Sequence, residues 1–205
     1  MKILLAAVNA KYIHSNLAVY SLRAYAKKYA RLAEGEHTVA IAEYTINHRT
    51  DDILAGIYRE APDVLMFSCY IWNICQIEEV MEEFHKLRPG IPIWVGGPEV
   101  SYETEKFLRE HPAVTGVMIG EGEETFCRLY EHYAAGRTGD ALGAIKGIAY
   151  QSGGSIAVNE CREPLELDCI PYCYEDIEDF ENRIVYYESS RGCPFSCSYC
   201  LSSVD

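Results

Sequence analysis

The stretch 64-VLMFSCYIWNICQIEEVMEEFHKL-87 contains one β–α unit and indicates the class of fold. Its first five residues, Val64–Ser68, are apolar up to the final serine, which is typical of a parallel strand covered by helices on both faces. Asn73 is a candidate helix cap, and apolar residues recur three and four positions apart through Ile74–Leu87. The stretch therefore predicts a buried strand followed by an amphipathic helix.

The same alternation of strand and helix patterns runs from residue 2 to about residue 136. Strands are predicted at Ile3–Val8, Val39–Tyr44, Val64–Ser68, Ile91–Val95 and Val117–Ile119, and helices at Asn16–Ala33, Asp51–Glu60, Ile74–Leu87, Tyr102–His111 and Glu123–Ala135. Five such units predict a doubly wound, five-stranded parallel sheet. Ligands of such sheets bind beyond the carboxyl ends of the strands, which here carry residues 9–16, 68–73, 96–101 and 120–124.

The pattern changes after Gly136. Ile148–Tyr150 and Ile156–Val158 predict a β-hairpin, residues 159–182 predict an irregular connection, and Arg183–Glu188 predicts a new strand. We therefore expect a first domain at 1–140, a hairpin and linker at 141–182, and the start of a second domain at 183–205.

Charge and composition limit the partners and the location. The 31 acidic and 18 basic residues give a net charge of −13, which disfavours binding to nucleic acid. No apolar run is long enough to span a bilayer, and the apolar N-terminal run is too short for a signal peptide. We therefore expect a cytoplasmic protein with neither nucleic acid nor membrane as a partner.

Cysteine usage separates packing residues from a candidate metal site. Without a secretory signal, nine cysteines do not predict a disulfide framework. Cys69, Cys75 and Cys127 lie in apolar or helical patterns and are interpreted as packing residues. No role is assigned to Cys161, Cys169 or Cys173, which lie in the irregular connection.

Cys193, Cys197 and Cys200 form a C-x3-C-x2-C pattern near the C-terminal end of the sequence. Three thiolates at this spacing can hold three corners of a cuboidal iron–sulfur cluster. Structural zinc normally takes four ligands from paired motifs, and no fourth cysteine or histidine lies nearby in the sequence. The pattern therefore favours a cluster with one open iron over structural zinc or incidental reduced thiols.

The segment 191-RGCPFSCSYC-200, directly after a predicted strand, resembles the signature of the radical S-adenosylmethionine enzymes. The resemblance implies that Cys193, Cys197 and Cys200 ligate a 4Fe-4S cluster whose open iron binds S-adenosylmethionine and generates a 5′-deoxyadenosyl radical. It implies that Tyr199 lies near the adenine, and that Arg183–Glu188 is the first strand of a truncated (β/α) barrel. An electron donor such as flavodoxin or ferredoxin would be a partner.

Two common ligands of doubly wound sheets do not fit the first domain. A dinucleotide site needs glycines after the first strand, but Asn9–His14 contains none. A response regulator needs an aspartate after the third strand, where this chain has Ser68.

The first domain instead resembles the cobalamin-binding domain, of flavodoxin-like Rossmann type, that precedes many radical S-adenosylmethionine enzymes. Ser68-Cys-Tyr70 stands at the serine motif of that domain, and Gly96-Gly97 follows at the expected distance. A serine hydroxyl can bond to the nucleotide tail, and paired glycines let the tail approach the backbone. The cobalamin-binding residues implied by the resemblance are Asn9, His14, Ser68, Cys69, Gly96, Gly97 and Gly120.

The first loop departs from the cobalamin pattern. Asn9 replaces an aspartate, Lys11 stands in place of the cobalt-binding histidine, and His14 is out of register. We therefore expect cobalamin with its own base displaced and no histidine on cobalt, with His14 as the alternative axial ligand. Gly120-Glu-Gly-Glu-Glu124 also resembles a family segment: its glycines suit close approach to the corrin, and its acids suit a helix start.

The predicted function is that of the N-terminal part of a cobalamin-dependent radical S-adenosylmethionine enzyme. We expect methyl transfer to an unactivated carbon or phosphorus of a small-molecule substrate. A radical cyclase of the anaerobic magnesium-protoporphyrin monomethyl ester type is one alternative, and a non-catalytic binding module without cobalamin affinity is another. Because the barrel is truncated, we expect this chain to be inactive alone and its cysteine loop to be metal-free or disordered.

Overall fold

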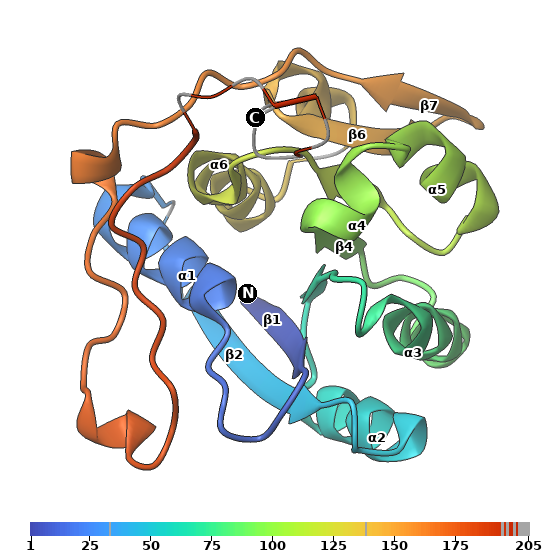
Figure 1. Ribbon diagram of the computed structural model, residues 1–205. Coiled ribbons are helices and arrows are strands. Elements are labelled where there is room, and N and C mark those ends of the chain that lie inside the picture. Colours follow the sequence, from blue (N-terminus) through green and yellow to red (C-terminus); the bar gives the residue numbers. More distant parts are fainter. Residues whose placement is uncertain (33, 138, 194, 196, 199, 201–205) are drawn as a thin grey trace.

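The computed structural model describes residues 1–32, 34–137, 139–193, 195, 197, 198 and 200. Its centre is a seven-stranded open sheet with the order β2-β1-β3-β4-β5-β6-β7 (Figure 1). The strands are β1 (Lys2–Asn9), β2 (Thr38–Thr45), β3 (Val64–Ser68), β4 (Ile93–Gly96), β5 (Gly116–Met118), β6 (Ile148–Ser152) and β7 (Ser155–Val158). The first five pair in parallel and the last two antiparallel. The order reverses at β1, so the doubly wound parallel arrangement is confirmed.

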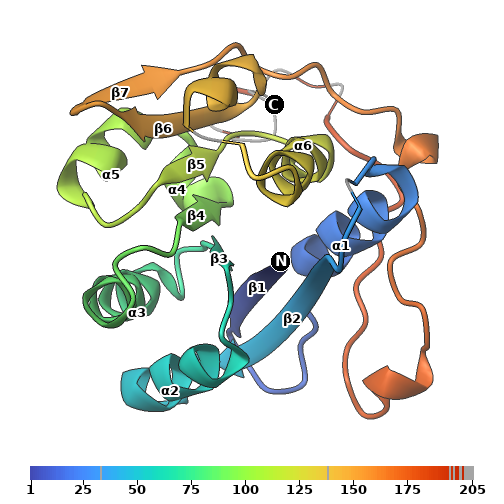
Figure 2. The same ribbon diagram turned by 180° about the vertical axis from the view of Figure 1, so that it is seen from behind.

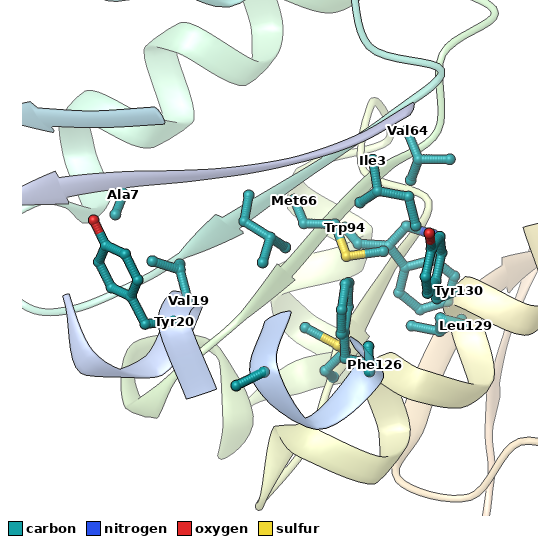
Figure 3. Close-up of a cluster of buried hydrophobic side chains, with 14 of the residues drawn as sticks. Ile3, Ala7, Val19, Tyr20, Val64, Met66, Trp94, Phe126, Leu129 and Tyr130 are labelled. Carbon is teal, nitrogen blue, oxygen red and sulfur yellow. The ribbon is translucent and has the colours of Figure 1, made fainter. Parts of the chain in front are cut away.

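Helices cover both faces of the sheet (Figures 1 and 2). They are α1 (Leu17–Tyr29), α2 (Thr50–Glu60), α3 (Ile74–Leu87), α4 (Pro98–Ser101), α5 (Thr104–Glu110) and α6 (Gly122–Ala134). One core places α1 and α6 against Ile3, Met66 and Trp94, as Figure 3 shows, and the other places α2, α3 and α5 against the opposite face. Alternate residues of β1 enter different cores, since successive side chains of a strand point to opposite faces.

Most predicted elements lie where the sequence patterns place them. The bounds of β3 and α3 coincide with the predicted strand at 64–68 and helix at 74–87. The predicted start of a helix near Ser101 is wrong, because Ser101 ends the short helix α4 and its hydroxyl donates to the carbonyl oxygen of Gly97 at 2.8 Å. Pro98 is the first residue of α4, where its missing N–H costs no hydrogen bond.

The predicted hairpin joins the same sheet as the parallel strands. β6 pairs with β5, with Gly116 opposite Tyr150, and β7 pairs with β6. The five predicted strands are present, but the hairpin extends the sheet to seven. The division of the chain at residues 140 and 182 stays a prediction.

Residues 159–191, here called the return segment, run along the outer side of α1 and back (Figure 1). Two short 3-10 helices interrupt this segment, η2 (Leu167–Cys169) and η3 (Glu178–Phe180). Tyr174 and Phe180 are buried against Tyr20 of α1, with ring centroids 5.5 and 5.1 Å from that of Tyr20. The return segment is therefore packed onto the first domain.

The strand predicted at Arg183–Glu188 is not present in the described structure. Ile184 makes one isolated parallel bridge to His14, with its N–H 2.6 Å from the carbonyl oxygen of Ile13. A strand needs a continuous neighbouring strand, and the described residues offer it only the short loop at 13–15. In the described part of the chain, no helix is both long and apolar enough to cross a membrane.

Candidate functional site

Four loops meet at the carboxyl edge of the parallel sheet. Asn9 ends β1, Ser68 ends β3, Gly96 ends β4, and Gly120 follows β5. The register places Ser68 beside Gly96. The structure therefore brings these predicted site residues to one edge, where ligands of doubly wound sheets bind.

The side chain of Asn73 holds two of these strand ends together. Its Nδ2 donates to the carbonyl oxygens of Val8, at 2.9 Å, and Ser68, at 3.0 Å, while its Oδ1 accepts from the backbone N–H of Tyr70 at 2.7 Å. Asn73 precedes α3 as predicted, but its side chain does not cap that helix. This role could not be predicted from the sequence, because an asparagine before a helical pattern indicates only a helix start.

Gly97 permits a close approach between two of the loops. Its φ is +111°, and a Cβ there would collide with the carbonyl oxygen of Cys69. The N–H of Cys69 donates to the carbonyl oxygen of Gly96 at 2.7 Å. Cys69 has no exposed surface, and burial raises the pKa of its thiol. In this structure Cys69 therefore supports the Gly96-Gly97 turn and packs in the core. Cys127 is also buried as predicted, but Cys75 is exposed, so its interpretation as a packing residue is wrong.

Open space and exposed apolar side chains border the edge. Gly120 has a φ of +71°, and among the described residues no atom beyond Gly120 and its chain neighbours lies within 4 Å of the position that a Cβ would take. The first two loops and the loop after α4 carry large exposed apolar side chains, which are Tyr12, Ile13, Ile71, Trp72 and Tyr102. The ring of Trp72 is stacked on that of Tyr70, with centroids 4.5 Å apart. An open edge with exposed apolar side chains suits a large, partly apolar ligand.

Asn9 is buried and belongs to a network around Glu43. Its Nδ2 donates to Oε1 of Glu43 at 2.9 Å, and the same oxygen accepts from the N–H of Asn16 at 3.0 Å. The other oxygen accepts from the Tyr20 hydroxyl at 2.7 Å and pairs with Arg183 at 2.8 Å. Burial and then the Glu43 carboxylate raise the pKa of Tyr20. Asn9 therefore shapes the loop through Glu43.

His14 contacts the return segment. Its Nδ1 hydrogen-bonds with the hydroxyl of Tyr186, and the two rings stack with centroids 5.7 Å apart. The carbonyl oxygen of His14 accepts from Asn9 at 3.1 Å and from Arg183 at 2.7 Å. One imidazole nitrogen is therefore engaged by a residue from the far end of the chain.

The residue pattern of the family described as "B12 binding domain" matches residues 3–130. The chain belongs to this family. The match begins in β1 and ends in α6, so the B12-binding domain includes all four edge loops. The hairpin and the return segment lie after the matched residues.

Three known proteins are similar to this chain over about two thirds of its length or more. The cobalamin-dependent radical SAM methyltransferase TokK of Streptomyces tokunonensis is 32% identical over an alignment of 152 residues that covers 68% of this chain and 22% of TokK. The anaerobic magnesium-protoporphyrin IX monomethyl ester cyclase of Rubrivivax gelatinosus is 24% identical over an alignment of 186 residues that covers 86% of this chain and 34% of the cyclase. The structure of the cobalamin-dependent S-adenosylmethionine radical enzyme OxsB, with aqua-cobalamin and S-adenosylmethionine bound, has a TM-score of 0.75 at 21% identity.

The likeness to OxsB covers 97% of this chain and 28% of that enzyme, and it shows a shared fold. The chain thus spans 22% of the length of TokK and 34% of that of the cyclase. The B12-binding domain is accordingly found in much longer proteins.

The cysteine loop follows the B12-binding domain and the return segment. Cys193 is exposed, and Cys197 and Cys200 are half-buried, with the N–H of Cys200 donating to the carbonyl oxygen of Cys197 at 3.1 Å. In the described part of the chain no cysteine forms a disulfide, and no group of three or more metal-binding side chains is gathered around one point. The predicted S-adenosylmethionine contact, Tyr199, lies outside the described residues.

Proposed function

We propose that this chain binds cobalamin at the carboxyl edge of its sheet and forms the N-terminal part of a radical S-adenosylmethionine methyltransferase. The observation that carries the proposal is the open edge at Gly120, bordered by exposed apolar side chains, in a chain of the B12-binding domain family. Cobalamin, when bound, would supply the carrier for a methyl group. Methyl transfer to an unactivated carbon or phosphorus of a small molecule is the proposed reaction.

The edge residues fit this cofactor in different ways. The hydroxyl of Ser68 would bond to the nucleotide tail, and Gly96, Gly97 and Gly120 would leave room for the cofactor beside the backbone. Asn73 and Cys69 would keep the loops in shape through the hydrogen bonds already described. The hydrogen bonds of Asn73 and Cys69 are present in the chain before any cofactor binds.

The first loop supports a cobalamin without a histidine on cobalt, because Lys11 stands in place of the family's cobalt-binding histidine and His14 is out of register. Asn9 is tied to Glu43, and His14 is engaged by Tyr186. Asn9 would therefore shape the floor of the site, and His14 would hold the return segment. This keeps the base-displaced form that the first loop predicts.

The cysteine loop would serve the second cofactor. Three thiols at C-x3-C-x2-C spacing are a suitable donor set for a 4Fe-4S cluster with one open iron, at which S-adenosylmethionine would bind. Cys193, Cys197 and Cys200 would be the ligands and Tyr199 a neighbour of the adenine. A flavodoxin or ferredoxin would be the electron donor. A cytoplasmic location would suit an oxygen-sensitive enzyme of this kind.

The similarity to the Rubrivivax cyclase supports a second candidate, a radical oxidative cyclase. The two candidates share both cofactors and differ in product. A longer protein containing this chain should form methylated product and S-adenosylhomocysteine if it is a methyltransferase. Ring closure without a methylated product would favour the cyclase.

A titration of the 205-residue chain with hydroxocobalamin, followed by desalting and a visible spectrum, tests the proposal. We expect about one cobalamin retained per chain, with the spectrum of the base-displaced form. Complete loss of the cobalamin on desalting would overturn the proposal and would favour a binding module that has lost this cofactor. Gly120→Val, which fills the open space, should reduce retention, while Gly153→Val, another positive-φ glycine with open space around it in the hairpin turn, is the matched control.

A further inference from the structure

Arg191, two residues before Cys193, lies against carboxylates of the B12-binding domain. Its Nη1 donates to Oε2 of Glu123 at 3.2 Å, its Nη2 donates to Oε1 of the same residue, and Nη1 lies 3.3 Å from Oε2 of Glu121. Its Nε donates to Glu188 at 2.7 Å. We call Arg191, Glu121, Glu123 and Glu188 the Arg191 clasp.

Glu123 is buried, unlike the carboxylates of ordinary surface ion pairs. It is 4% exposed, and its Oε1 also accepts from the Ser21 hydroxyl of α1 at 2.8 Å. Burial alone would raise the pKa of Glu123, but the hydrogen bonds from Arg191 and Ser21 hold it below its usual value. A buried carboxylate is stable only with such partners, so Arg191 is needed where it lies.

The Arg191 clasp connects two places that matter to the proposed function. Glu121 and Glu123 stand at the start of α6, directly after the edge glycine Gly120. Arg191 stands at the start of the cysteine loop. From the sequence, these acids suit only a helix start, because the partner arginine is far away along the chain.

A second ion pair holds the other end of the same stretch. Arg183 pairs with Glu43 at 2.8 Å, near the carboxyl end of β2, and donates to the carbonyl oxygen of His14. Between the two arginines, the carbonyl oxygen of Tyr186 accepts from the Tyr174 hydroxyl at 2.9 Å. The stretch from residue 183 to residue 191 is therefore attached at both ends and in its middle.

We propose that Glu123 is a positioning residue for the cysteine loop: by holding Arg191 it fixes where the loop begins relative to the carboxyl edge of the sheet. The functional meaning of this contact rests on the proposed function, since only a cluster-binding loop gains from a fixed distance to cobalamin. The contact itself belongs to the metal-free chain and is tested without either cofactor.

Trypsin provides the test, because Arg191 is itself a cleavage residue. While the Arg191 clasp is closed, the guanidinium is occupied and the bond to Gly192 should be cut only when the clasp opens. Cleavage after Arg109, near the end of α5 and far along the chain from the clasp, gives a reference rate in the same digest. The measured quantity is the rate after Arg191 divided by the rate after Arg109, obtained by mass spectrometry on the 205-residue chain.

We expect Glu123→Gln to raise this ratio by about tenfold or more, because it removes the charge that holds the arginine. Glu124→Gln is the matched control: Glu124 is the next residue on α6 but pairs with Arg128 and Arg162. It should leave the ratio within about twofold of the parent value. Glu123→Asp, which keeps the carboxylate, should restore most of the protection.

A ratio for Glu123→Gln within twofold of the parent would overturn the proposal, whether both rates rise or neither does. An Asp variant no better protected than the Gln variant would overturn it too, because charge would then not hold Arg191. Cobalamin retention is measured separately. A raised ratio with no cobalamin retained would support the positioning role of Glu123 and overturn the proposed function. An unchanged ratio with cobalamin retained would overturn the positioning role and leave the proposed function standing.

Discussion

The hydroxyl of Tyr186 hydrogen-bonds to Nδ1 of His14, a residue 172 positions earlier in the chain. The contact joins the first edge loop to the return segment. It is reinforced by the bridge between Ile184 and His14 and by the hydrogen bond from Arg183 to the His14 carbonyl oxygen. The histidine that the sequence offers as an alternative cobalt ligand thus has a structural partner.

The first prediction concerns this histidine. His14→Ala should leave the visible spectrum of retained cobalamin unchanged, because His14 is out of register with the family's cobalt-binding histidine. It should lower the free energy of unfolding by about 1 kcal/mol, the usual worth of one hydrogen bond. Tyr186→Phe should have a similar effect, measured by urea denaturation. A spectrum that shifts in His14→Ala but not in Tyr186→Phe would instead identify His14 as an axial ligand.

Gly97→Ala should destabilise the edge. The backbone at φ +111° disfavours any side chain, and the new Cβ would collide with the Cys69 carbonyl oxygen. We expect a loss of about 2 kcal/mol or more in unfolding free energy, together with weaker cobalamin retention. Gly90→Ala is the control, since a Cβ there meets nothing within 4 Å and its φ is ordinary. Equal stability in the two variants would refute the close approach.

Asn73→Ala should affect both stability and the site. It removes the donor to the Val8 and Ser68 carbonyl oxygens, and we expect a loss of about 2 kcal/mol. Asn159→Ala is a matched control, because Asn159 Nδ2 also donates to two carbonyl oxygens, those of Leu142 and Ile145, which lie outside the four edge loops. Both variants should lose stability in urea, but only Asn73→Ala should reduce cobalamin retention. Equal cobalamin retention in the two variants would show that Asn73 does not shape the cobalamin site.

Glu123 predicts a dependence of stability on pH. Its folded-state pKa is lowered, so its contribution is complete above the ordinary glutamate value of about 4.3 and is lost as pH falls through the folded value. The free energy of unfolding, measured in urea, should therefore fall more between about pH 5 and pH 3 for the parent than for Glu123→Gln. Glu160→Gln is the control, because the Glu160 side chain is largely exposed in its pair with Lys146 and contributes little. A parent and a Glu123→Gln variant with parallel pH profiles would contradict this role.

Local patterns predicted the bounds of β3 and α3 to the residue, because a buried strand and an amphipathic helix are both recognised from the spacing of apolar residues close together in the sequence. The carboxyl-edge site followed from the same patterns, since parallel strands end at one edge. The hydrogen bond from Asn73 to the Val8 carbonyl oxygen and the ion pair between Glu123 and Arg191 could not be predicted, because the partners lie far apart along the chain. The place of the hairpin beside β5 was missed for the same reason: Gly116 and Tyr150 meet only after the sheet has assembled.

The packed return segment changes how the B12-binding domain and the cysteine loop are joined. A flexible linker would let the cysteine loop sample many separations from the carboxyl edge, and the effective concentration of one part at the other would fall with linker length. A segment held by Tyr174, Phe180, Arg183 and Arg191 removes that freedom in advance. The start of the cysteine loop is therefore placed beside the B12-binding domain when the chain folds. Little further conformational entropy has to be lost when the loop and the domain act together.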